Sequence, residues 1–105
     1  MKEITVKELK SMMDEGADFD LIDVREQNEY DICHLNGKLI PMGQVADNVD
    51  QISREKKVVV HCRSGGRSAN VISFLEQQHG YDNLYNLVGG VLAWSDEIDP
   101  TMPKY

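Results

Sequence analysis

The sequence predicts a small α/β domain in which a parallel sheet is covered by helices on both faces. Stretches with strand and helix patterns alternate along the whole chain, which is the order expected when helices cross over between parallel strands. The apolar, β-branched run Val58–Val60 is typical of a strand buried on both faces. A chain of 105 residues has the usual size of one domain with one core, so residues 1–105 are expected to form a single domain.

The first half of the chain contains clear helix and strand signals. Thr5 and Glu8 have the spacing of a capping box, which predicts a helix that begins there. Pro41 ends a strand, because proline has no N–H group to donate to a neighbouring strand. The expected elements are, in order, the strand Glu3–Ile4, the helix Thr5–Glu15, the strand Phe19–Val24, a helical turn at Gln27–Tyr30 and the short strand Lys38–Ile40.

The second half continues the alternation. Val45, Val49 and Ile52 recur at helical spacing, which predicts a helix over Gly43–Ile52. Gly80 stands where a helix commonly ends. The other expected elements are the strand Lys57–His61, a helix from Ser68 to Gly80, the strand Leu84–Leu87 and the helix Val91–Glu97.

Cys62 is placed between a predicted strand and a predicted helix, with Gly65 and Gly66 allowing a sharp turn between the two. Unpaired backbone N–H groups and the positive end of the helix dipole meet at such a position and favour an anion there. Arg63 and Arg67 add two positive charges beside the thiol. We therefore expect a lowered pKa for Cys62, which makes its thiolate a nucleophile.

Other roles for Cys62 have less support. An inert buried cysteine needs neither the flanking arginines nor the paired glycines, and a redox dithiol needs a second cysteine nearby. His61 precedes Cys62 on a strand, so its side chain points to the opposite face and is a poor general base, while His34 is expected to be a structural hydrogen-bonding residue. The histidines and cysteines show no zinc spacing, so no metal or cofactor is predicted.

The composition excludes several classes of partner. The net charge is −7 and the isoelectric point is about 4.8, which disfavours nucleic acid. No apolar run approaches the ~20 residues of a membrane-spanning helix, and the N-terminus lacks the apolar core of a signal peptide. Two cysteines in such a chain are expected to be reduced thiols, and the expected location is the cytoplasm.

The segment Cys62–Ser68, which we call the Cys62 loop, resembles the active-site loop of rhodanese-family sulfurtransferases. Its residues are Cys62-Arg63-Ser64-Gly65-Gly66-Arg67-Ser68. Three further segments resemble the same family in order and spacing: Asp23-Val24-Arg25 with Glu29-Tyr30, His34-Leu35 with Gly37 and Ile40-Pro41, and Gly89-Gly90 with Ala93-Trp94. The resemblance covers nearly the whole chain and implies a three-layer α/β/α domain with a five-stranded parallel sheet in the order 1-5-4-2-3.

The resemblance also implies that Cys62 carries sulfur. Its thiolate would take sulfane sulfur from thiosulfate or a related small donor and pass it to cyanide or a thiol. Two alternatives stay open: a persulfide relay or binding module that serves a partner protein, and a Cys-based phosphatase or arsenate reductase. The last is disfavoured because only four residues separate Cys62 from Arg67, whereas the phosphatase loop has five. Arg63 and Arg67 are expected to attract the anionic donor, and Arg67 also to brace the loop.

Supporting residues and one departure from the family pattern complete the expectations. Asp23 is expected to accept hydrogen bonds from loop amides, and Arg25 to pair with a carboxylate such as that of Glu29. Cys33 stands where the family most often has glycine. Because the third strand must run parallel to the second, we expect Cys33 near the amino ends of the strands, roughly 16 Å from Cys62, too far for a disulfide.

Overall fold

A five-stranded parallel sheet forms the centre of the molecule, in the strand order β1-β5-β4-β2-β3. The computed structural model describes all 105 residues. Its strands are β1 (Lys2–Ile4), β2 (Phe19–Asp23), β3 (Lys38–Leu39), β4 (Lys57–His61) and β5 (Leu84–Leu87). The predicted fold class and strand order are therefore confirmed.

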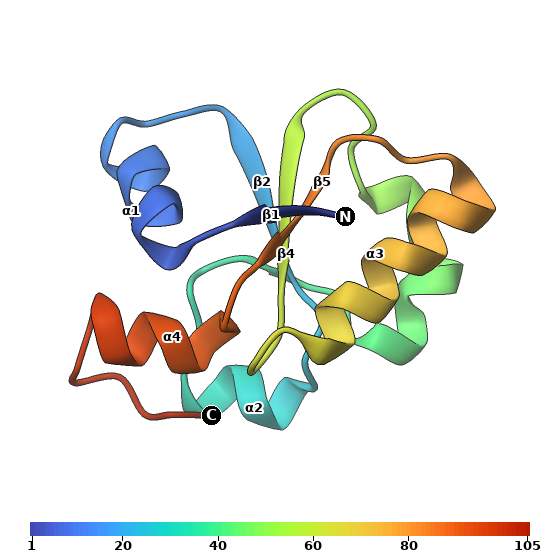
Figure 1. Ribbon diagram of the computed structural model, residues 1–105. Helices are drawn as coiled ribbons and strands as arrows, with labels where there is room; N and C mark the ends of the chain where they lie inside the picture. The colour runs from blue at the N-terminus through green and yellow to red at the C-terminus, as the bar shows by residue number, and fades with distance from the viewer.

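Helices cover both faces of this sheet, as Figure 1 shows. One face carries α1 (Val6–Asp14) and α4 (Gly90–Glu97), and the other carries α3 (Gly66–His79). The central strand alternates between two cores, since Val58 and Val60 pack on the side of α3 whereas Val59 packs on the side of α1 and α4. The short helix α2 (Gln27–Ile32) lies beyond the ends of the strands rather than over a face.

The helix ends follow the local sequence. Thr5 and Glu8 form the predicted capping box, in which the Thr5 hydroxyl accepts the Glu8 N–H and the Glu8 carboxylate accepts the Thr5 N–H. Gly80 ends α3 with a φ of +66°, a conformation in which only glycine lacks a steric penalty.

The helix predicted over Gly43–Ile52 is wrong. The chain forms two 3₁₀ helices there, η1 (Met42–Asp47) and η2 (Val49–Gln51). In an α-helix the N–H of Asn48 would bind the carbonyl of Gln44, but here the Asn48 side chain donates to that carbonyl at 2.7 Å while its N–H turns to Val45. An asparagine side chain that replaces a backbone donor in this way breaks an α-helix.

No helix in this structure has both the length and the apolar character that crossing a bilayer requires.

Candidate active site

Cys62 lies at the carboxyl edge of the sheet, which is the edge where the strands end. It follows β4 directly, and Gly65, with a φ of +116°, turns the chain into α3. The residue is 1% exposed, so its sulfur is recessed at the base of the Cys62 loop. Open α/β sheets bind their ligands at this edge.

Hydrogen-bond donors of the Cys62 loop surround the sulfur. The N–H of Gly65 donates to Sγ at 3.1 Å, and the Ser68 hydroxyl lies 3.4 Å from it. Burial raises the pKa of Cys62, but the Ser68 hydroxyl and the backbone N–H groups of Ser68, Gly65 and Ser64 outweigh it, so the pKa lies below the ordinary thiol value. The direction is the predicted one, and its cause is hydrogen bonding rather than the arginine charges.

Arg67 is held by Glu29 and not by the sulfur. Its two terminal nitrogens donate to the two carboxylate oxygens of Glu29 at 2.7 and 2.8 Å. The hydrogen bond from Arg67 lowers the pKa of Glu29 to about 2, against the effect of burial. Arg63, in contrast, is exposed and takes part in no ion pair, so it is the free cation of the loop.

Arg25 pairs with a carboxylate as expected, but the carboxylate is that of Asp23 rather than that of Glu29. Its Nε donates to Oδ1 of Asp23 at 3.0 Å and its Nη2 to Oδ2 at 2.8 Å, with both side chains fully buried. Asp23 also accepts the backbone N–H of Arg25 at 3.0 Å, which confirms its expected role as an acceptor for loop amides. The guanidinium contacts Glu29 through that residue's backbone carbonyl alone, at 3.5 Å, because the Glu29 carboxylate faces Arg67.

Cys33 lies at the carboxyl edge of the sheet, so its expected placement is wrong. Its carbonyl accepts Nη2 of Arg25 at 2.7 Å, and its thiol lies 3.4 Å from the carbonyl of Pro103 in the C-terminal tail. The reason is the shortness of β3, which pairs with the last two residues of β2 and leaves the chain little distance to return. Both cysteines are free thiols. That they form no disulfide with each other stays a prediction, but the expected separation along the strands no longer supports it.

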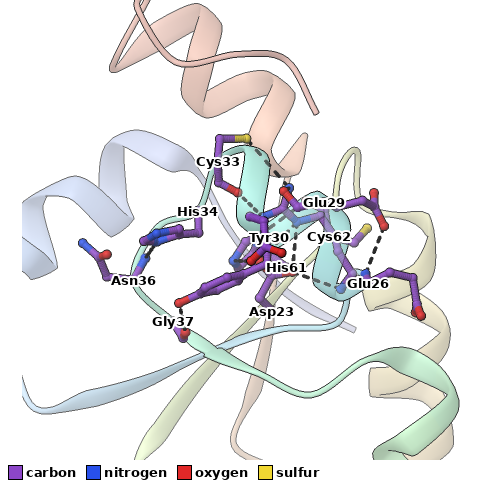
Figure 2. Close-up of polar contacts among 12 residues, drawn as sticks. Asp23, Glu26, Glu29, Tyr30, Cys33, His34, Asn36, Gly37, His61 and Cys62 are labelled. Atoms are coloured by element: carbon purple, nitrogen blue, oxygen red, sulfur yellow. Dashed lines mark hydrogen bonds and ion pairs between the residues drawn. The ribbon is translucent and has the colours of Figure 1, made fainter.

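Neither of the two histidines of this region forms a hydrogen bond to the Cys62 sulfur. His34 accepts the N–H of Asn36 at 3.2 Å and stacks on Tyr30 with ring centroids 4.4 Å apart, which confirms its structural role (Figure 2). His61 is fully buried, with Nε2 3.7 Å from Oδ2 of Asp23. Burial lowers the pKa of His61, and the nearby Asp23 opposes this effect without reversing it.

The first turn of α4 holds the backbone of the Cys62 loop from behind. The N–H of Val91 donates to the carbonyl of Cys62 at 3.1 Å, and the N–H of Leu92 donates to that of Arg63 at 3.0 Å. A side chain at Gly90 would collide with these two carbonyls. The carbonyls are thereby turned away from the sulfur, which leaves the loop N–H groups free to face it.

Asn86 of β5 contacts the loop, although none of the sequence motifs includes it. Its side chain accepts the Ser68 hydroxyl at 2.6 Å and donates to the Gly65 carbonyl at 3.2 Å. Asparagine is uncommon in strands, so a buried asparagine near the end of a strand that is otherwise Leu-Tyr-Leu is the signal that marks this residue.

The chain matches the sequence profile of the Rhodanese-like domain over residues 5–97. It is 35% identical over 101 residues to a Bacillus subtilis protein named as a candidate sulfurtransferase, YtwF, covering 95% of this chain and 96% of that protein. It is 32% identical over 105 residues to a Mycobacterium tuberculosis protein named as a candidate adenylyltransferase/sulfurtransferase, MoeZ, covering 97% of this chain. This chain spans 26% of that protein and 38% of another large curated relative.

Solved structures agree with the sequence relatives. A rhodanese-like domain protein from Staphylococcus aureus superposes with a TM-score of 0.83 at 37% identity, covering 93% of this chain and 95% of that one. Sequence profile, full-length relative and structure therefore point to one and the same family.

Proposed function

This chain belongs to the rhodanese-like domain family, and on that premise we propose that it is a sulfurtransferase of the thiosulfate type. Residues 1–105 would act as one domain, with Cys62 as the sulfur carrier. The observation that carries the proposal is the set of donors around the Cys62 sulfur: the Ser68 hydroxyl and the N–H groups of Ser64, Gly65 and Ser68 lower its pKa. These donors stabilise an anionic sulfur, which both steps of the transfer require.

In the first step the Cys62 thiolate attacks the outer sulfur of thiosulfate. A new S–S bond forms to Cys62, and the S–S bond within thiosulfate breaks. Its electron pair leaves with sulfite. The product on the protein is a persulfide, which is anionic at its terminal sulfur, and the loop N–H groups are placed to stabilise it as they stabilise the thiolate.

In the second step a nucleophilic acceptor takes the terminal sulfur. Cyanide or a thiolate attacks that sulfur, the S–S bond to Cys62 breaks, and its electron pair returns to the Cys62 thiolate. Since sulfur is held covalently between the two steps, ping-pong kinetics are expected. A recessed sulfur, in a residue that is 1% exposed, favours a donor whose reacting atom protrudes, as the outer sulfur of thiosulfate does.

The two arginines have different roles in this proposal. Arg63 is exposed and free of ion pairs, so it attracts the anionic donor. Arg67 braces the loop through Glu29, which the bidentate contact at 2.7 and 2.8 Å supports. Asp23 and Arg25 form a fully buried ion pair, which supports the carboxyl edge of the sheet.

A protein acceptor is the second candidate. This chain matches 26% of the length of a relative that is named as both an adenylyltransferase and a sulfurtransferase, and we extend the proposal to a protein acceptor on the basis of that combination. Arg63 and Ser64 are exposed beside the recessed sulfur and would meet such an acceptor. Comparing turnover with small thiols and with an acceptor protein distinguishes the two.

Intact mass measured after incubation with thiosulfate tests the reaction class. We expect the protein to gain one sulfur atom, cyanide to remove it, and Cys62→Ser to show no gain, because a serine hydroxyl forms no persulfide. Cys33→Ala is the matched control, since it removes the other free thiol and should gain sulfur normally. A sulfur adduct on Cys62→Ser, or none on the unaltered protein, would overturn the proposal.

A further inference from the structure

The hydroxyl of Ser68 has one proton and three acceptors. Oδ1 of Asn86 lies at 2.6 Å, the carbonyl oxygen of Gly65 at 3.2 Å and Sγ of Cys62 at 3.4 Å. Ser68 is fully buried and Asn86 is 6% exposed, so water does not replace a missing partner easily. Which acceptor receives the proton therefore matters to all of them.

The Gly65 carbonyl is already satisfied. It accepts the backbone N–H of Ala69 at 3.1 Å and Nδ2 of Asn86 at 3.2 Å, which uses both of its lone pairs. The same contact orients the Asn86 side chain, because a carbonyl can only accept and must face the NH₂ group. Oδ1 of Asn86 then faces Ser68, and the Ser68 proton has two remaining destinations, Asn86 and the sulfur.

The preferred destination depends on the state of Cys62. When Cys62 is a thiol, its S–H donates to Ser68 and the Ser68 hydroxyl donates to Asn86, so every group is paired. When Cys62 is a thiolate, the first arrangement places a lone pair of Ser68 against the anionic sulfur. Rotation of the hydroxyl then directs its hydrogen bond to the sulfur and leaves Oδ1 of Asn86 without a donor.

We infer that Asn86 is a positioning residue that competes with the Cys62 sulfur for the single proton of Ser68. It holds the hydroxyl while Cys62 is protonated and releases it when sulfur becomes anionic. No bond to a heavy atom is made or broken, since the step is a rotation about the Ser68 side-chain bond. Only the relevance of this competition to sulfur transfer rests on the proposed function, because a persulfide at Cys62 would accept a hydrogen bond from the same hydroxyl.

The direction in which one substitution shifts the pH midpoint of Cys62 alkylation separates this role from a purely structural one. Asn86→Leu has a similar size and removes the competing acceptor, so Ser68 is free to donate to the thiolate. The pH midpoint for alkylation of Cys62 by iodoacetamide should then fall by about half a pH unit. If Asn86 merely held the loop in shape, its loss would disturb the donors and the midpoint would rise.

A double-mutant cycle with Ser68→Ala completes the test. Ser68→Ala alone should raise the midpoint, because it removes a donor to the thiolate. Asn86→Leu should have no further effect in that background. Reactivity is read for the Cys62 peptide by mass spectrometry, so that Cys33 does not contribute. A higher midpoint in Asn86→Leu, or an equal shift of the midpoint by Asn86→Leu with and without the Ser68 hydroxyl, would overturn the inference.

Two further variants protect the test. Asn86→Asp offers a stronger acceptor, so it should raise the pH midpoint more when Ser68 is present than in the Ser68→Ala background. Equal rises in the two backgrounds would overturn the inference, and this comparison does not depend on whether Asn86→Leu folds. Asn83→Leu is the matched control, because Asn83 likewise donates its side-chain NH₂ group to backbone carbonyls, at 2.6 and 2.8 Å, but lies at the opposite end of β5. It should leave the pH midpoint unchanged, and a shift like that of Asn86→Leu would overturn the inference. Alkylation does not involve sulfur transfer, so a failure of the thiosulfate reaction leaves this result readable.

Discussion

At the scale of single residues, positive charge near the candidate nucleophile is divided unequally between two arginines. Arg67 gives both ends of its guanidinium to Glu29, whereas Arg63 remains exposed and unpaired. A bidentate contact to a carboxylate leaves little of the charge for a third group. We therefore expect the attraction of an anionic donor to depend on Arg63.

Removing this charge should weaken the use of an anionic donor. Arg63→Ala is expected to raise KM for thiosulfate about three- to tenfold with a smaller change in kcat, since a surface charge contributes on the order of 1 kcal/mol. Arg63→Lys should retain most of the wild-type KM. Lys7→Ala is the control, because Lys7 is an equally charged and highly exposed residue of α1. Unaltered KM in Arg63→Ala would assign donor attraction to Arg67 instead.

At the scale of elements, one carboxylate connects α2 with α3. Glu29 caps the start of α2 by accepting the N–H of Glu26 at 3.0 Å, and it binds Arg67 in the first turn of α3. The residues are 38 positions apart in sequence. The position of α2 and the shape of the Cys62 loop therefore depend on the same side chain.

This connection gives the protein a defined acid dependence. The pKa of Glu29 is about 2 in the folded state against 4.5 for the ordinary group, so its contribution to stability is complete above pH 4.5 and is lost as the pH falls toward 2. The shift corresponds to roughly 3 kcal/mol as an upper value. Glu29→Gln should lower the free energy of unfolding by about 2–3 kcal/mol at pH 7 and flatten its fall below pH 5.

Urea denaturation at pH 7 and at pH 3 measures both effects. Glu55→Gln is the control, because Glu55 is exposed and forms no ion pair. If Glu29→Gln and the wild-type protein lost the same stability between these two pH values, Glu29 would not be the group that titrates.

The start of α4 offers a second element-scale prediction. A Cβ at Gly90 would meet the Cys62 and Arg63 carbonyls, the latter at 2.7 Å, and the φ of Gly90 is +53°. Gly90→Ala should therefore destabilise the fold by about 2 kcal/mol or more and slow sulfur transfer at least tenfold, because the loop must move. Gly43→Ala is the control, since a Cβ at Gly43 would have no neighbouring atom within 4 Å. Wild-type melting temperature and turnover in Gly90→Ala would contradict the proposed role of α4 in shaping the loop.

At the scale of the whole molecule, a net charge of −7 opposes the approach of an anionic donor. This repulsion acts over a long range and is screened strongly between 0.01 and 0.15 M salt, where the screening length falls from ~30 to ~8 Å. Attraction by Arg63 acts at short range and is screened less. The value of kcat/KM for thiosulfate should therefore rise about two- to threefold as sodium chloride increases over this interval.

The rate of Cys62 alkylation by neutral iodoacetamide, compared with anionic iodoacetate, provides the control. Only the anionic reagent should show the same rise with salt. A fall of kcat/KM with added salt would mean that the local cation outweighs the net charge at all distances.

How much of this architecture the sequence predicts depends on how local each signal is. The strands, the capping box at Thr5 and the donors around Cys62 rest on neighbouring residues, and all of them are found. The Glu29 to Arg67 pairing and the Asn86 contacts join residues 18 or more positions apart, which no local pattern encodes. The expected placement of Cys33 is wrong because it assumes that the third strand begins beside the start of the second, whereas β3 pairs with the last two residues of β2.

The donors that face the Cys62 sulfur are mostly main-chain N–H groups, those of Ser64, Gly65 and Ser68. A substitution replaces a side chain and leaves such a group in place, unless it introduces proline. Sequence drift at the exposed positions Arg63 and Ser64 therefore leaves the anion-stabilising chemistry intact and changes what the rim of the site recognises. If Cys62 carries sulfur as proposed, new donors or acceptors can evolve without first losing the N–H groups that face the sulfur.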